Sequence, residues 1–213
     1  MALNEKFLKN YALVILIAYV TLCIGILLHE WGHSTMAFIF GLKSNPFNIH
    51  YSHRLFMLGI SEHVDYQKAA LLMPWKAILI SAAGPLVNFI LIILSLIFVN
   101  LLYKKANAWI TFIFYCFYFW NMNEWFNYLI IRDIFPRGDV AHMIKFGMPH
   151  WILLLIGILT GVGFLYLLFK KVNIKLFSAF KLTPAQSKKF TRTIIIVFIV
   201  TQGITLYNDL FMY

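Results

Sequence analysis

The segment HEWGH, residues 29–33, places two histidines and a glutamate at a spacing that suits metal chemistry. On an α-helix, His29 and His33 are four residues apart and project from one face, where two imidazoles can bind a single zinc ion. A zinc ion held by two histidines and a third ligand keeps a position open for water and lowers the pKa of that water to about 7. Glu30 lies beside the pair and can accept the proton of that water. The segment therefore predicts zinc-dependent hydrolysis of a peptide bond.

The element that must position this segment is an apolar run. Residues 11–28 contain no charged side chain, and a helix of this length can cross the roughly 30 Å hydrocarbon layer of a bilayer. An ionisable group in hydrocarbon costs roughly 2.5–3.5 kcal/mol, so such groups are usually retained for function. The alternative interpretation is a pair of histidines satisfied by neighbouring helices, with Glu30 at the membrane edge.

The composition is typical of a lipid-facing protein, since 62% of the 213 residues are hydrophobic and only 12% are charged. Uncharged runs predict about five transmembrane helices, at residues 11–28, 77–103, 106–123, 150–169 and 193–208. We therefore expect an all-α polytopic membrane protein with a three-helix catalytic core. It should form one membrane-embedded domain over residues 1–213, with the catalytic core in about 8–148 and additional helices in about 149–213.

The net charge of +10 does not indicate a nucleic-acid partner, because the 18 Lys and Arg residues are scattered over loops and span ends. Anionic lipid headgroups of the surrounding bilayer are the partner that this distribution favours.

Two segments between the runs have patterns of their own. Residues 46–60 alternate apolar and polar side chains around a turn near residues 52–54, which predicts a small membrane-associated β-hairpin. Its edge strand could hold an unwound substrate segment by β-augmentation. Residues 170–192 space apolar side chains among lysines, which fits either a helix in the headgroup region or a solvated linker.

A catalytic zinc site needs a third protein ligand near the same membrane face as the histidines. Counting spans, the chain enters along 11–40, returns along 77–103 and enters again along 106–131. The loop that follows lies at the HEWGH end of the protein, and it carries Asp133 and Asp139. Both aspartates can in principle reach the histidine pair.

Three separated motifs resemble, in the expected order, those of the site-2 protease family of intramembrane zinc metalloproteases. They are HEWGHSTMAFIFGLK at 29–43, SAAGPLVNF at 81–89 and GDVAHMI at 138–144. The resemblance covers roughly residues 20–145. It implies a helical core of three spans around a zinc ion and a transmembrane protein as the substrate.

The resemblance also assigns roles to individual residues. It implies that His29, His33 and Asp139 bind zinc and that Glu30 is the general base. It further implies that Asn88 lies near the substrate or the oxyanion. Gly84 and Pro85 would let the second helix approach closely, and with Asn88 they are the candidate substrate-binding residues.

The third motif departs from the family pattern. Gly138-Asp139-Val140 stands where the family has an aspartate-glycine pair, and no Asn-x-x-Pro immediately precedes it. Asp133 falls near the place of that asparagine. We expect Asp139 rather than Asp133 to be the ligand, because DVAHM aligns with the start of the family's helix and Asp is a favoured N-cap. His142, three residues later, either orients Asp139 or faces solvent.

The function that the resemblance implies is the hydrolysis of peptide bonds within or near transmembrane segments, in regulated intramembrane proteolysis. The protein would be a multi-pass protein of the cell membrane with its active site towards the cytosol. The count of Lys and Arg opposes this orientation, because the catalytic-loop side carries 7 and the other side 11, five of them beyond Lys171. The oligomeric state is not predicted.

Two other functions use the same residues differently. A non-proteolytic membrane metal-binding protein or metal transporter could employ the two histidines and the aspartate without a role for Glu30. A prenyl-protein endopeptidase would need a downstream glutamate ligand, and the later glutamates, Glu62 and Glu124, have no matching motif. Glu124 is interpreted as an interfacial charge among aromatic residues, with a place in the substrate path as the alternative.

Overall fold

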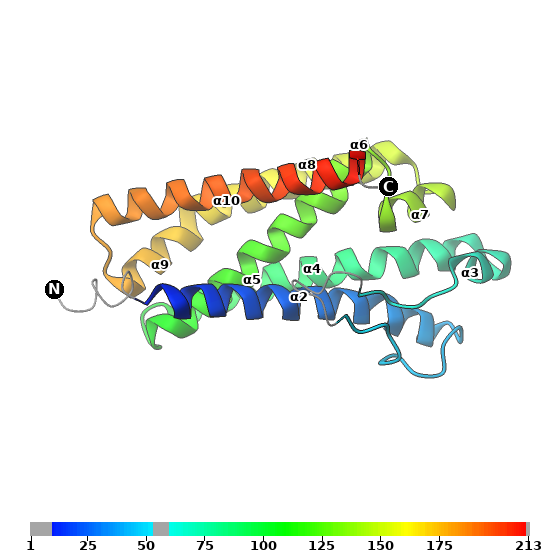
Figure 1. Ribbon diagram of the computed structural model, residues 1–213, viewed down its shortest axis with the longest axis horizontal. Coiled ribbons are helices and arrows are strands. Elements are labelled where there is room, and N and C mark those ends of the chain that lie inside the picture. Colours follow the sequence, from blue (N-terminus) through cyan, green and yellow to red (C-terminus); the bar gives the residue numbers. More distant parts are fainter. Residues whose placement is uncertain (1–9, 53–59, 212–213) are drawn as a thin grey trace.

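Figure 1 shows the computed structural model, which describes residues 10–52 and 60–211. These residues fold as helices and contain no β-strand, so the prediction of an all-α protein is confirmed for them. In chain order the helices are α2 (Tyr11–Ile39), α3 (Tyr66–Leu72), α4 (Pro74–Leu102), α5 (Ala108–Phe126), η2 (Asn127–Ile131), α6 (Arg132–Ile134), α7 (Gly138–Lys145), α8 (His150–Leu167), η3 (Leu168–Val172), α9 (Asn173–Phe180) and α10 (Pro184–Phe211).

Four helices in the described part of the chain are long and apolar enough to cross a membrane. They are Ala12–Ile39, Pro74–Leu102, His150–Phe180 and Pro184–Tyr207. Each contains one of the predicted runs or most of it, and the protein is therefore an integral membrane protein. His150–Phe180 ends after its uncharged run, and Pro184–Tyr207 begins before its own. Both helices continue through lysines, which a helix can do once its end has reached the headgroup region.

The remaining predicted run, residues 106–123, forms α5, but α5 is not one of these four helices. Because of its tyrosines, tryptophans and asparagines, α5 has no membrane-length stretch as apolar as those of the four helices. Those side chains serve the interior instead: Tyr115 and Tyr118 are buried, and the Tyr118 hydroxyl donates a hydrogen bond of 2.7 Å to the carbonyl of Phe164 in α8. As Figure 1 shows, α5 crosses the middle of the protein, where it contacts α2, α4 and α8.

Helices α2, α4 and α5 pack against one another as a three-helix core. Helix α2 comes close to α4 at Gly32, where a Cβ would lie 2.9 Å from the carbonyl oxygen of Ala83. Small residues at membrane helix contacts permit this approach of two backbones. The indole N–H of Trp120 donates to the carbonyl of Ala18 at 2.8 Å and ties α5 to α2. This packing holds the face of α2 that carries the histidines against α4.

The predicted β-hairpin falls in the segment between α2 and α3. Its described part forms one antiparallel bridge, in which the backbones of His50 and Ser61 exchange hydrogen bonds of 2.9 and 3.2 Å. Most of the predicted turn and second arm, residues 53–59, lies outside the described residues, so the hairpin stays a prediction. The Lys43 ammonium donates to the carbonyls of Asn48 and Glu62, and so holds the two flanks of the segment together.

The basic segment 170–192 is neither wholly an interfacial helix nor a linker. Its first part continues α8 through a π-helical turn, η3, into α9, which packs against α4 and α5. Leu176 and Phe180 are buried in this contact. The chain then turns at Lys181, in the left-handed conformation with φ 52°, and α10 begins at Pro184. The solvated-linker interpretation is therefore wrong for residues 173–180.

Candidate metal centre

His29 and His33 project from one face of α2, as the HEWGH spacing predicts, and Asp139 of α7 meets them there. The Nε2 atoms of the two histidines are 3.1 Å apart, and each lies 3.2 Å from Oδ2 of Asp139. Ligand atoms placed 2.0–2.1 Å from one tetrahedral zinc ion would be about 3.3 Å from each other. Within residues 10–52 and 60–211, these three form the one cluster of metal-ligating side chains that could hold an ion.

The connection after α5 brings Asp139 to the histidines. Helix α5 continues through the π-helical turn η2 and the short α6, and α7 then packs on α4. Gly138, the first residue of α7, has φ +55°, a conformation that a residue with a side chain seldom adopts. This glycine lets the chain turn so that Asp139 falls in the first turn of α7. The Gly-Asp order that departs from the family pattern therefore has a local structural reason.

Asp133, the other aspartate that the sequence left open, lies outside this cluster. Its side chain is buried, and His150 Nδ1 at the start of α8 lies 3.1 Å from its Oδ1. Burial raises the pKa of the Asp133 carboxyl, and the pairing with His150 opposes this effect. Asp133 therefore pairs α6 with α8, and Asp139 is the aspartate beside the histidines.

The space between the histidines exists because residue 84 is a glycine. A Cβ on Gly84 would overlap Nε2 of His33 and would lie 2.5 Å from Nε2 of His29. The volume that a methyl group would fill is thus within coordination distance of both nitrogens. Two imidazoles and a carboxylate are a donor set that zinc accepts. The residues present fit a zinc ion in size and in chemistry.

Neighbouring groups fix the orientation of the imidazoles. Nδ1 of His33 donates to the carbonyl of Ile80 at 2.6 Å, which leaves its Nε2 free to act as a ligand. Pro85 lies inside α4 and has no N–H, so it donates no hydrogen bond to the carbonyl of Ser81, the residue after Ile80. The His29 ring stacks on Tyr128, at a centroid distance of 4.8 Å, and the Arg132 guanidinium lies 4.7 Å from the Tyr128 ring.

The charge of Asp139 suits a metal ligand. Burial alone raises the pKa of its carboxyl, but the adjacent imidazoles of His33 and His29 outweigh this effect and hold the pKa below its ordinary value. The carboxylate is therefore ionised at neutral pH and available as an anionic ligand.

A small cavity lies beside His29 and Glu30. Its volume is about 30 Å³, close to the share of one molecule in liquid water. Asn88 is buried on α4, and Nδ2 of Asn88 and Oε2 of Glu30 have no hydrogen-bond partner among the described residues. The cavity thus offers a donor and an acceptor to a small polar group. It is lined by Gly25, Ile26, His29, Glu30, Asn88, Glu124 and Tyr128.

Sequence reasoning missed several residues around this cavity. Glu124 lines it together with Glu30, so the interpretation of Glu124 as an interfacial charge is wrong. The available signal was that Glu124 directly follows the uncharged run 106–123 and is the one acidic residue of α5. Tyr128 gave no signal, because its position depends on the π-helical turn η2.

The segment before α3 covers another side of the site. The Tyr66 hydroxyl donates to Oε1 of Glu62 at 2.7 Å, and the Glu62 carboxyl lies close to that of Glu30. The ring of His142 packs on Tyr66 with a centroid distance of 4.2 Å. His142 is therefore half-buried against an aromatic ring, and the solvent-facing interpretation is wrong.

Comparison with known proteins identifies the family of the chain. A sequence model of Peptidase family M50, the site-2 protease family, matches residues 17–207, which include both histidines, Glu30, Asn88 and Asp139. No curated protein and no solved structure matches the chain. The match covers most of the sequence and agrees with the HEWGH helix, the membrane-spanning helices and the converging ligand atoms. The chain belongs to Peptidase family M50 and is a membrane metallopeptidase.

Proposed function

We propose that the protein is an intramembrane zinc metalloprotease that hydrolyses peptide bonds within or near transmembrane segments of membrane-protein substrates. One observation carries the proposal: three metal-ligating side-chain atoms lie 3.1–3.2 Å apart, and one of them, on His29, belongs to a residue that lines a small cavity together with Glu30, whose Oε2 has no partner among the described residues. A structural metal site needs the ligands alone. A hydrolytic site also needs a base beside a place for water.

His29, His33 and Asp139 would hold the zinc ion. When bound there, zinc supplies a Lewis acid that polarises the scissile carbonyl and makes a neighbouring water more acidic. Glu30 accepts the proton of the attacking water in the cavity and afterwards delivers it to the leaving amine. The His33 bond to the Ile80 carbonyl and the stack of His29 on Tyr128 keep both imidazoles in place during these steps.

The α4 residues would act on the substrate. The free amide N–H of Asn88 can donate to the oxyanion that forms when water adds to the carbonyl. Gly84 and Pro85 keep the backbone of α4 close to the ligands, so that a substrate segment can pass over them. A transmembrane helix must unwind before it is cut, and the flanks of residues 46–60 could pair with the unwound strand. We assign the protein to regulated intramembrane proteolysis on this basis.

The alternative, a metal transporter or another non-proteolytic metal-binding protein, would use the same three ligands. It assigns nothing to Glu30, to Asn88 or to the cavity between them. Membership of Peptidase family M50 favours the protease.

The third ligand gives the first test of this function. We expect purified protein to bind about one zinc ion per chain. Asp139→Ala should lose that zinc and the cleavage of a transmembrane substrate in proteoliposomes, because two imidazoles alone hold zinc weakly. Asp133→Ala is the matched control, since this carboxylate pairs with His150; it should keep zinc even if it unfolds at a lower temperature. Full zinc in Asp139→Ala with loss in Asp133→Ala would reverse the assignment. Metal analysis of both variants gives the answer.

We also propose that the protein lies in the cell membrane with the metal centre towards the cytosol. Ser61, beside the segment that covers the site, then faces the cytosol. Ser61→Cys, in a background where Cys23 and Cys116 are replaced by Ala, should resist a membrane-impermeant thiol reagent in sealed cells. It should react fully once the cells are opened. Rapid labelling in sealed cells would show that the excess of Lys and Arg at the other end sets the orientation.

A further inference from the structure

The end of the protein opposite the metal centre carries a pocket that the proteolytic function does not use. Figure 1 shows α9 at one end of the molecule and α3 and α7 at the other. The pocket lies between the end of α4, the turn that follows it, and the helix formed by η3 and α9. Its volume is about 540 Å³, a size typical of ligand sites. It is lined by Leu96, Asn100, Tyr103, Lys104, Lys170, Lys171, Ile174, Lys175 and Ser178.

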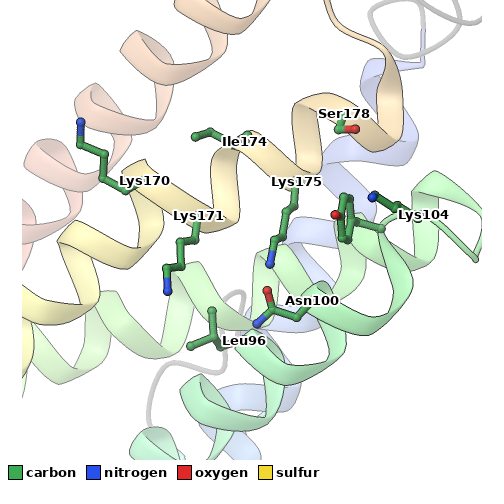
Figure 2. A pocket seen from close by; sticks show the side chains of 9 residues that line it. Leu96, Asn100, Lys104, Lys170, Lys171, Ile174, Lys175 and Ser178 are labelled. Carbon is green, nitrogen blue, oxygen red and sulfur yellow. The ribbon is translucent and has the colours of Figure 1, made fainter.

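Three of its four lysines converge. Figure 2 shows the side chains of Lys171 and Lys175 directed from their helix towards Leu96 and Asn100 on α4, while Lys104 approaches from the turn. The ring of Tyr103 is near two of them: its centroid is 5.5 Å from Nζ of Lys104 and 5.3 Å from Nζ of Lys175. Lys170 extends away from the other lysines. The convergent lysines come from two separate parts of the chain.

These positive charges are not neutralised by carboxylates in the part of the chain that the structure describes. None of the nine lining residues is acidic, and no ion pair among the described residues involves these lysines. Like charges that converge on one pocket repel each other and create a positive potential inside it. An anion bound between them would relieve this repulsion. The pocket also offers the amide of Asn100 and the hydroxyl of Ser178 as hydrogen-bond donors.

The surroundings of the pocket suit an anion that has an apolar tail. Leu96 and Ile174 contribute apolar surface to the pocket itself. Beside it on α4, Ile97 and Leu101 have side chains that are 45% and 58% exposed. The pocket lies at the C-terminal end of the membrane-spanning helix Pro74–Leu102, and the ends of such helices are where lipid headgroups are expected. A free anion would have no use for this adjoining apolar surface.

We propose that this pocket binds the phosphate headgroup of an anionic phospholipid, whose acyl chains lie along the exposed apolar side of α4. Lys104, Lys171 and Lys175 contact the phosphate, and Asn100 and Ser178 donate hydrogen bonds to the headgroup. Basic pockets between membrane helices bind anionic headgroups in this way. The bound lipid bridges α4 and α9, and so fastens the helices behind the metal centre to one another. The site is independent of the proteolytic function.

Lipid titration followed by native mass spectrometry of the intact protein tests the proposal. Phosphatidylglycerol should bind to the wild type in preference to phosphatidylcholine. The triple variant Lys104→Ala, Lys171→Ala, Lys175→Ala should bind phosphatidylglycerol on the order of a hundredfold more weakly, since each lysine near an anionic headgroup contributes to the affinity. The control removes three lysines from the same end but outside the pocket, by Lys181→Ala, Lys188→Ala and Lys189→Ala. It should keep the wild-type affinity.

Thermal unfolding of the same variants provides a second readout. Phosphatidylglycerol should raise the unfolding temperature of the wild type and of the control, but not of the pocket variant. Equal loss of binding in both triple variants would overturn the proposal, because the lipid would then respond to net charge alone. Inorganic phosphate that displaces the lipid at low millimolar concentration would also overturn it, since the pocket would then be a site for a free anion.

Discussion

Gly84→Ala is expected to abolish zinc binding. The new methyl group would overlap Nε2 of His33 and lie 2.5 Å from Nε2 of His29, where the ion should sit. Neither imidazole can withdraw cheaply, because His33 is bonded to Ile80 and His29 is stacked on Tyr128. A displacement of about 1 Å at a reacting centre typically costs a hundredfold in rate, so cleavage should fall at least about that far.

The zinc content and the unfolding temperature of the purified variant are the measurements. Gly163→Ala on α8 is the matched control, since it adds the same methyl group to a membrane-spanning helix with no atom within 4 Å. It should keep both zinc and stability. Full zinc in a folded Gly84→Ala protein would contradict the position that we assign to the ion.

Glu30→Gln is expected to keep zinc and the fold but to lose catalysis. Glutamine has nearly the shape of glutamate and can still form hydrogen bonds in the cavity, but it does not accept a proton at neutral pH. Removal of a general base typically costs a hundredfold to ten-thousandfold in rate, so a gel-based assay should detect the loss. Because substrate binding is retained, an uncut transmembrane protein should co-purify with the variant.

The same substitution separates the protease from a transporter. A transit or structural metal site has no proton to remove from an attacking water, so Glu30→Gln would leave metal flux or assembly intact. Asp65→Asn is a suitable control, because Asp65 is exposed, caps α3 at some distance from the ligands, and is replaced by a residue that also caps. This control should cleave at the wild-type rate.

The sequence predicted the parts of the site that depend on local spacing. A spacing of four residues places His29 and His33 on one face of a helix whatever surrounds them, so this part of the site followed from helix geometry alone. The uncharged runs likewise predicted the four described helices that are long and apolar enough to cross a membrane. Asp139 and Asp133 could not be separated by such reasoning, because both belong to one connection. Which of them meets the histidines depends on the turn at Gly138, and backbone conformation of this kind is not encoded in residue spacing.

The missed features depend on how helices rotate and pack against each other. Glu124 lines the cavity because α5 is a central helix, whereas its aromatic and amide side chains had suggested a membrane interface. Gly84 leaves room between the two imidazoles only because α4 faces α2 at this level. The basic pocket arises because η3 continues α8 into α9, and both η3 and α9 pack against α4. Each of these contacts joins segments that are far apart in the sequence.

The most direct test of the central claim is a comparison of peptide termini in the membranes of cells that express the wild type or Glu30→Gln at equal levels. Mass spectrometry of the membrane fraction identifies the new termini. The wild type should generate termini within or next to transmembrane segments, and these should be absent with Glu30→Gln, whose uncut substrates should accumulate. Identical sets of termini, from a variant shown to carry full zinc, would contradict the claim that Glu30 serves a zinc protease in the membrane.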